Sequence, residues 1–247
     1  MRLRETLLAL FLVGLSCGCW PFATGVLHAT LSDVARSGDA LAISDTLETL
    51  IAEGKDTPAD REFALKTVQT REPPAPTAAY GFARAAISGR VVQTRGLAGA
   101  GLVAEVEKWA LASRKLDPSF RGGAAARMLG TLYVMAPAGW LEHGDSEQGL
   151  ELLEGLVKAH PEHLENLLRL AEAYIALGDP GPGTPYLCRC RARRDQLRRD
   201  DQQLLDHLFA DAGNPACPKA TAPAVTPTST PTSAPEPPRT PTPAPTH

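Results

Sequence analysis

The chain has 247 residues, 43 % of them hydrophobic, and its 25 Lys and Arg against 28 Asp and Glu leave a net charge of −3. This near-neutral balance has none of the basic excess that attracts nucleic acid, so nucleic-acid binding is not expected. When both atypical ends are set aside, about 195 residues remain, which suits one domain with a sizeable core.

Residues 1–18 have the pattern of an export signal. Arg2 and Arg4 precede an apolar run at residues 6–15, which is much shorter than the ~20 apolar residues that a membrane-spanning helix needs. A small residue precedes both Cys17 and Cys19, as in the bacterial lipobox, where the cysteine after the cleavage site carries a lipid. We predict lipidation at Cys19, with Cys17 as the alternative and a cleaved signal without lipid as the remaining interpretation. The lipid would anchor the chain to a membrane of the bacterial cell envelope, facing the periplasm.

The next hundred residues predict a series of helices. The apolar pattern over residues 27–54 indicates two helices with a break at 37–39, and Thr57 before Pro58 is typical of an N-cap and first helical position. Proline-rich residues 72–76 predict a loop. An alanine-dense helix over about 77–92, a break at 96–101 and a helix over 102–116 follow.

The middle of the chain carries one helix-pair signature twice, with the small and large residues of a tetratricopeptide-type (TPR) hairpin. Gly130 and Ala171 are 41 positions apart, seven more than the period of about 34, and the irregular residues 136–142 accommodate this insertion. Pro118 stands to Ser113 as Pro161 stands to Leu156, which indicates a third hairpin. The first copy comprises Leu129, Gly130, Tyr133, Gly149, Leu153 and Leu156; the second comprises Leu167, Leu170, Ala171, Tyr174, Gly183, Leu187 and Cys190.

The remaining elements complete an all-α fold. Asp145 and Gln148 predict a capping box, residues 178–185 predict a glycine-proline loop, and two helices are expected at 186–194 and 196–210. No strand pattern competes. We therefore predict TPR-like helical-hairpin repeats, an α-solenoid or bundle, over residues 19–213.

Residues 214–247 hold half of the chain's prolines, with Thr, Ser and Ala between them. This composition cannot bury enough apolar surface to offset the entropy of ordering, so we predict a disordered tail. A tail of this kind could reach the cell-wall layer, although a plain solvated tail is the simpler interpretation.

The sequence offers little for catalysis. His143, His160, His163 and His207 lie at separate turns or caps, and no nucleophile elbow, phosphate loop or dinucleotide motif occurs. We expect no enzyme activity, no cofactor and no metal site. For the arginine-rich residues 189–199, a salt-bridged surface is the default, with contact to anionic lipid or an acidic partner as the alternative. We expect a buried free thiol at Cys190, with a bridge from Cys217 to Cys188 or Cys190 as the alternative.

Three aromatic residues are candidates for a ligand or partner surface. Tyr133 and Tyr174 occupy equivalent repeat positions, and Trp140 lies in the seven-residue insertion. TPR-like stacks present a concave surface lined by the first helix of each pair, and an apolar loop could close it into a pocket. The simpler interpretation is that Trp140 packs on its own hairpin.

These residues also resemble a known family. The run LDPSFRGGA at 116–124, with Asn166 and residues 170–173 and the lipobox cysteine upstream, is similar to the TatT lipoproteins, TPR-type proteins associated with periplasmic TRAP transporters. The resemblance covers roughly residues 19–179. It is also carried by Leu129-Gly130, Ala136-Pro137, Gly144-Asp145 and Gly149-Leu150.

The resemblance implies an all-helical periplasmic lipoprotein with a cavity or pore. Its expected partners are the substrate-binding protein of a TRAP-type transporter, the membrane through the N-terminal lipid, and a hydrophobic small molecule. The Trp140 loop, residues 46–76 and the proline-rich tail depart from the family pattern. The alternative function is a structural cell-envelope scaffold that binds no ligand.

Overall fold

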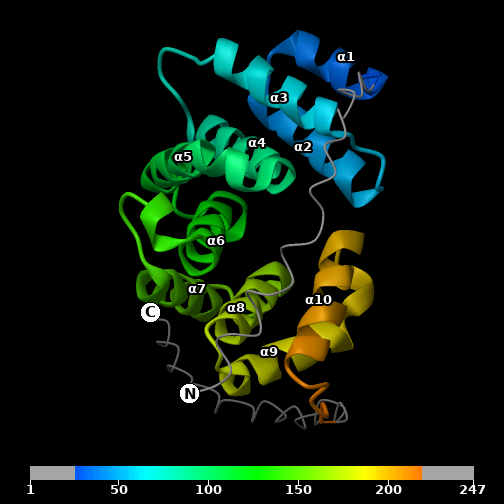
Figure 1. Cartoon of the computed structure of the whole chain (residues 1–247), viewed down its shortest axis with the longest axis vertical. Coiled ribbons are helices and arrows are strands. Elements are labelled where there is room, and N and C mark those ends of the chain that lie inside the picture. The colour runs from blue at the N-terminus through cyan, green and yellow to red at the C-terminus, as the bar shows by residue number, and fades with distance from the viewer. Residues whose placement is uncertain (1–25, 219–247) are drawn as a thin grey trace, which may run out of the picture. The chain divides into compact units, whose positions relative to one another are not determined.

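The computed structural model describes residues 26–218, which are helical and contain no strand. All the described helices belong to one compact unit that ends at Ala216. The α-helices, labelled in Figure 1, are α1 (Ala29–Ser37), α2 (Ala40–Ala52), α3 (Pro58–Thr70), α4 (Ala78–Arg95), α5 (Val103–Leu116), α6 (Phe120–Met135), α7 (Ser146–Ala159), α8 (Leu164–Ala176), α9 (Pro180–Ala192) and α10 (Arg199–Asp211). Short 3₁₀ helices cover Gly96–Leu102, Ala138–Trp140 and Arg194–Gln196.

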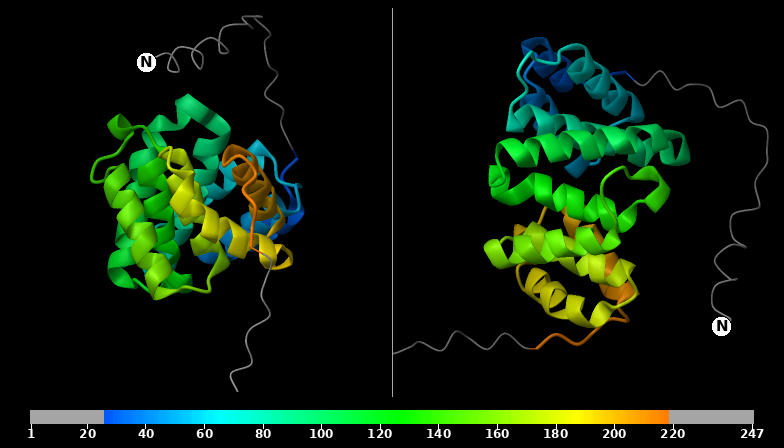
Figure 2. Two further views of the ribbon diagram at one scale, coloured as in Figure 1. Left: turned by 90° about the horizontal axis from the view of Figure 1, so that it is seen from below. Right: turned by 90° about the vertical axis from the view of Figure 1, so that its left-hand side faces the viewer.

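Antiparallel hairpins stack in chain order, as the right-hand view of Figure 2 shows. The most extensive helix contacts join α4 to α5, α6 to α7 and α8 to α9. The first of these pairs is the third hairpin that Pro118 indicated, and its enlarged internal loop is the 3₁₀ helix Gly96–Leu102. Helix α10 follows the last pair and contacts α8, α9 and also α2. The predicted all-α fold of TPR-like repeats is confirmed.

Local caps determine where several helices begin. The Thr57 side chain accepts a hydrogen bond from the Asp60 backbone N–H, and the Asp60 carboxylate accepts one from the Thr57 backbone N–H. This is a reciprocal capping box with Pro58 in the first turn. At α7, Asp145 accepts from the Gln148 backbone N–H at 2.9 Å. Among the described residues the Gln148 side chain makes no return bond, so only half of that predicted capping box forms.

The repeat signature places its small residues where two helices cross. A Cβ on Gly149 would lie 2.8 Å from the Gly130 carbonyl oxygen and 2.8 Å from Tyr133 Cβ. A Cβ on Gly183 would lie 3.2 Å from the Ala171 carbonyl oxygen and near Tyr174 Cβ. The two hairpins are therefore packed alike, and the repeat inferred from spacing is real.

The predicted loop at residues 178–185 is wrong, because helix α9 begins at Pro180. Prolines in the first turn of a helix remove N–H groups that have no intrahelical partner, so Pro180 and Pro182 are compatible with the start of α9. Pro185 lies deeper and does remove a backbone bond. Close packing of Gly183 and burial of Leu187 stabilise the helix despite this loss.

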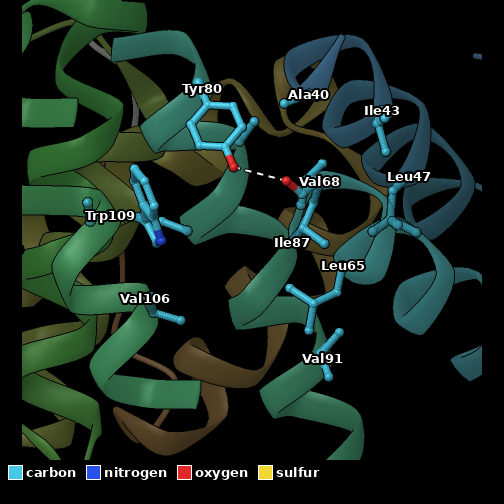
Figure 3. Close-up of a cluster of buried hydrophobic side chains, with 14 of the residues drawn as sticks. Ala40, Ile43, Leu47, Leu65, Val68, Tyr80, Ile87, Val91, Val106 and Trp109 are labelled. Atoms are coloured by element: carbon cyan, nitrogen blue, oxygen red, sulfur yellow. Dashed lines mark hydrogen bonds between the residues drawn. The ribbon is translucent and has the colours of Figure 1, made fainter. Parts of the chain in front are cut away.

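Apolar residues of α1 to α6 form the main core, part of which Figure 3 shows. Ile43, Leu47 and Ile87 are almost completely buried. The Tyr80 hydroxyl donates to the Val68 carbonyl oxygen at 2.9 Å, and the Tyr80 ring meets Trp109 edge-on at 5.3 Å. These contacts fix α3, α4 and α5 together.

Two further expectations concern cysteines and membranes. Cys190 is a buried free thiol, as predicted, and burial raises its pKa to about 12. Cys17 and Cys19, the predicted lipidation sites, lie outside the described residues, as does most of the proline-rich tail. Within residues 26–218 no helix has the length and apolar character to cross a membrane.

Candidate functional site: a cavity inside the helical stack

A cavity of about 1270 Å³ lies on the inner side of the stack. Its walls come from α2, α4, α6 and α8, with contributions from the start of α5, the Trp140 loop and the start of α10. The arrangement follows from the repeat, because the first helix of each hairpin faces the concave side.

One part of the cavity is apolar. It is built by Phe82 and Ala86 of α4, Met128 and Leu132 of α6, and Trp140 of the inserted loop. These side chains are partly buried, so their apolar surface stays open to the cavity. A wall of this kind suits the apolar body of a small molecule.

Another part of the lining is charged, and its charges are paired. Arg127 of α6 lies 2.7 Å from the Glu165 carboxylate, and Arg169 of α8 bonds to Glu172 at 2.9 Å and to Asp201 at 2.8 Å. Burial lowers the pKa of Arg127, and the charge of Arg169 adds to this. Burial raises the pKa of Asp201, opposed by the Arg169 charge.

A tight turn brings Arg127 into this position. Arg121, Gly122 and Gly123 all have positive φ, so the chain enters α6 through three left-handed residues. The fully buried Asn166 of α8 donates to the Gly122 carbonyl oxygen at 3.4 Å and accepts from Arg127 at 2.7 Å. This side chain therefore joins the turn, α6 and α8.

A network of four cavity-lining side chains joins the two ends of the stack. We call Glu48, Arg90, Arg198 and Asp200 the clasp. Arg90 of α4 makes a two-pronged ion pair with Glu48 of α2, at 2.7 and 2.6 Å. Arg198, at the start of α10, reaches the same Glu48 carboxylate at 3.0 Å and bonds to Asp200 at 3.0 and 3.2 Å.

The clasp changes the acidity of its central carboxyl. Burial by itself would raise the pKa of Glu48, but the hydrogen bonds and charges of Arg90 and Arg198 outweigh it and hold that pKa below its usual value. Glu48 is therefore ionised near neutral pH and bound to two arginines at once.

The structure places the three predicted aromatic residues differently. Trp140 lines the cavity. Tyr133 is 5 % exposed and packs against Gly144 and Gly149. Tyr174 packs near Gly183, and its hydroxyl donates to Glu154 of α7. Neither tyrosine is among the described residues that line the cavity, so the tyrosines serve the repeat packing and are not brought together with Trp140.

A buried carboxylate holds the Trp140 loop in place. Glu107 of α5 is completely buried and accepts hydrogen bonds from the backbone N–H groups of Glu142 at 2.8 Å and His143 at 2.9 Å. The Tyr133 hydroxyl bonds to it as well, and burial together with this bond raises the pKa of Tyr133. Glu107 thus positions the loop that contributes Trp140 to the apolar part of the cavity.

The remaining candidate groups are the metal-ligating side chains and the arginine-rich segment. No cluster of three or more metal-ligating side chains occurs among residues 26–218. In the arginine-rich segment, Arg189 and Arg193 pair with Glu162, and Arg194 pairs with Asp206. Arg191 lies over the Phe209 ring at 4.6 Å. Most of that segment is therefore a salt-bridged surface.

Sequence reasoning missed Glu48, Arg90, Glu107 and Asn166. Glu107 gave a local signal, because it is an acidic residue close to the apolar Val106 and Trp109 on a helix, and Asn166 appeared only among the residues of the family resemblance. Glu48 and Arg198 are 150 positions apart, and nothing local links them.

Comparison with known proteins agrees with the repeat. A tetratricopeptide repeat family matches residues 141–181, which cover the end of the Trp140 loop, α7, α8 and the first residues of α9. No curated protein matches the chain. TPR-type folds are typically non-enzymatic scaffolds that bind other proteins. With the stacked hairpins, this match shows that the chain is a TPR-containing protein.

Proposed function

We propose that this protein is a membrane-anchored, periplasmic TPR-like lipoprotein that binds a partner protein and a small apolar ligand in support of TRAP-type transport. The observation that carries the ligand part is the cavity of about 1270 Å³ with one apolar wall. Small-molecule sites are usually apolar cavities of roughly 300–1,000 Å³. The space is therefore ample for one such ligand.

The charges of the cavity favour a ligand without a strong anionic group. Each arginine that lines it is already in an ion pair, and a bound anion would have to displace a carboxylate. An apolar molecule resting on Phe82, Met128 and Trp140 needs no such exchange, and its burial is favourable by roughly 25 cal/mol per Å².

The neutral dye N-phenyl-1-naphthylamine tests this proposal. We expect its fluorescence to rise on binding to the full chain and Met128→Glu to weaken binding about tenfold, because a carboxylate on the apolar wall is left without water. Fluorescence titration measures the affinity.

Leu97→Glu is the matched control, since Leu97 is 82 % exposed and is not among the residues that line the cavity. Its affinity for the dye should equal that of the unmodified chain. Absence of dye binding to the unmodified chain, or equal loss in both variants, would refute a ligand site in the cavity.

The TPR repeat supports a protein partner in general, and the resemblance to the TatT family motivates the more specific one. We expect a TRAP-type substrate-binding protein to co-purify with the tagged chain from gently extracted membranes. The competing function is a structural scaffold. The ion pairs of the cavity-lining arginines are compatible with it, because these arginines need no ligand to balance their charge. Recovery of cell-wall components alone would support the scaffold and contradict the transport role.

The proposed anchor rests on the cysteines that follow the apolar N-terminal run. Cys19→Ala should move the chain from the membrane fraction to the soluble fraction, while Cys17→Ala should leave it in the membrane fraction. Fractionation and immunoblotting measure this. If neither change, nor both together, releases the protein, it is not a lipoprotein.

A further inference from the structure

We propose that one edge of the helical stack lies against the membrane to which the N-terminal lipid anchors the chain. We call this edge the apolar edge and define it by Leu97, Met135 and Leu177. The inference rests on the proposed function, because it requires the lipid at Cys19. It adds the surface that the protein presents to the bilayer, and with it the orientation of the stack.

Three exposed apolar side chains lie at the same turn of three successive hairpins. Leu97 follows α4, Met135 ends α6 and Leu177 follows α8, and these residues are 82, 53 and 43 % exposed. Because successive helices alternate in direction, α4, α6 and α8 run parallel and end at one edge of the stack. Single exposed apolar residues are normal on a soluble protein, but a row of them marks a contact surface. At the opposite edge, Leu116 is the only large apolar residue of comparable exposure among residues 26–218.

The first residues that the structure describes join the stack at this edge. The His28 backbone N–H donates to the Asp60 carboxylate, near the start of α3, at 2.8 Å. Glu62 of α3 makes a two-pronged ion pair with Arg95, the last residue of α4, at 2.7 and 2.5 Å. The start of α1 therefore lies near the end of α4, and the right-hand view of Figure 2 shows it on the same side of the stack as the loop between α6 and α7. A lipid upstream of Val26 is thus attached at the apolar edge.

The length of the tether favours contact at this edge. Seven positions separate Cys19 from Val26, and they can span at most ~25 Å. Helix α4 has 18 residues, so the opposite edge lies about 27 Å farther along the helices. The tether also contains Trp20, a residue type that is enriched at membrane interfaces. A lipid on Cys19 therefore keeps the apolar edge closer to the membrane than the opposite edge.

The charged side chains near the apolar edge do not favour an anionic lipid. Lys55, in the turn after α2, pairs with Glu53 at 2.9 Å, and Arg95 is paired with Glu62. Asp179, just before α9, adds a negative charge. A neutral lipid surface therefore suits this edge, and the burial of apolar side chains supplies the attraction.

Fluorescence quenching tests the orientation of the lipidated full chain. The chain is reconstituted in phosphatidylcholine vesicles in which some lipids carry a nitroxide on the headgroup, and a fluorophore is attached through p-acetylphenylalanine at Lys55 or at Lys115. Both positions are exposed; Lys55 lies at the apolar edge and Lys115 in the last turn of α5, at the opposite edge. The nitroxide quenches only nearby fluorophores, so the fluorophore at Lys55 should lose most of its emission and that at Lys115 should keep most of it.

The double variant Leu97→Glu with Leu177→Glu separates apolar contact from tethering. A carboxylate in place of each leucine opposes burial in the bilayer, so the population with this edge against the membrane should fall about tenfold. The fluorophores at Lys55 and Lys115 should then be quenched alike. Leu116→Glu is the matched control, because it makes the same change on an exposed leucine at the opposite edge, and it should keep the original difference.

Each other outcome overturns a stated part of the proposal. Equal quenching at both positions of the unmodified chain refutes the apolar edge, and stronger quenching at Lys115 would assign the contact to the edge where Arg189 of the arginine-rich segment lies. An unchanged difference in the double variant means that the tether alone orients the chain, which refutes the apolar contact. If Cys19→Ala and Cys17→Ala together fail to release the chain from membranes, the lipid anchor fails and this inference fails with it. A lipid-anchored chain without a preferred edge refutes this inference alone.

Discussion

Glu107→Ala is expected to lower the free energy of unfolding by about 3 kcal/mol, which corresponds to a fall of roughly 10 °C in Tm for a chain of this size. The carboxylate is completely buried and accepts from the backbone N–H groups of Glu142 and His143 and from the Tyr133 hydroxyl. Its removal leaves these donors without an acceptor and out of reach of water. Thermal and urea unfolding followed by circular dichroism measure the loss.

Two further variants make this result specific. Lys115→Ala lies in the exposed last turn of the same helix and should change stability by less than about 0.5 kcal/mol. Glu107→Gln keeps the shape and one acceptor oxygen, so its loss should be intermediate. If Glu107→Ala behaves like Lys115→Ala, the carboxylate does not hold the Trp140 loop.

Gly149→Ala and Gly155→Ala should change stability in opposite directions, although both lie in α7. A Cβ at position 149 meets the Gly130 carbonyl oxygen and Tyr133 Cβ at 2.8 Å, so α6 and α7 must move apart, at a net cost of about 2 kcal/mol. A Cβ at position 155 meets nothing within 4 Å, and alanine is the better helix former by about 0.5–1 kcal/mol.

The same unfolding measurements compare the two glycine variants. A fall in Tm for Gly149→Ala with a small rise for Gly155→Ala would confirm that the repeat glycine is required by helix contact. Equal and small effects would mean that the hairpin adapts to the added methyl group. In that case the contact between α6 and α7 would not require a glycine at position 149.

Much of the helical framework could be predicted from local pattern. The break between α1 and α2, the Thr57 cap and the paired positions of Gly130 with Gly149 and of Ala171 with Gly183 all appear in the structure. Each depends on residues close in sequence or on a repeated spacing. Apolar periodicity, caps and small-residue contacts act over one or two helices, so they can be predicted from the sequence alone.

Helix α9 and the candidate site are features that local sequence pattern does not predict. The prolines of Pro180–Ala192 indicate a loop, yet packing against α8 makes the segment helical. Of two residues that the sequence offers equally as candidates for a ligand or partner surface, Trp140 lines the cavity, whereas Tyr133 is buried against Gly149. The orientation of a side chain on a helix depends on what packs beside it.

By itself, the sequence determined that the described part of this chain is a stack of TPR-like helical hairpins, because hairpin formation depends on short-range periodicity and on small residues at helix crossings. Only the tertiary structure decided that the inner helices of the stack line a shared cavity and that Glu48 and Arg198 face each other. The physical reason is that the small rotation between successive hairpins accumulates over the whole stack, and no local pattern records the sum.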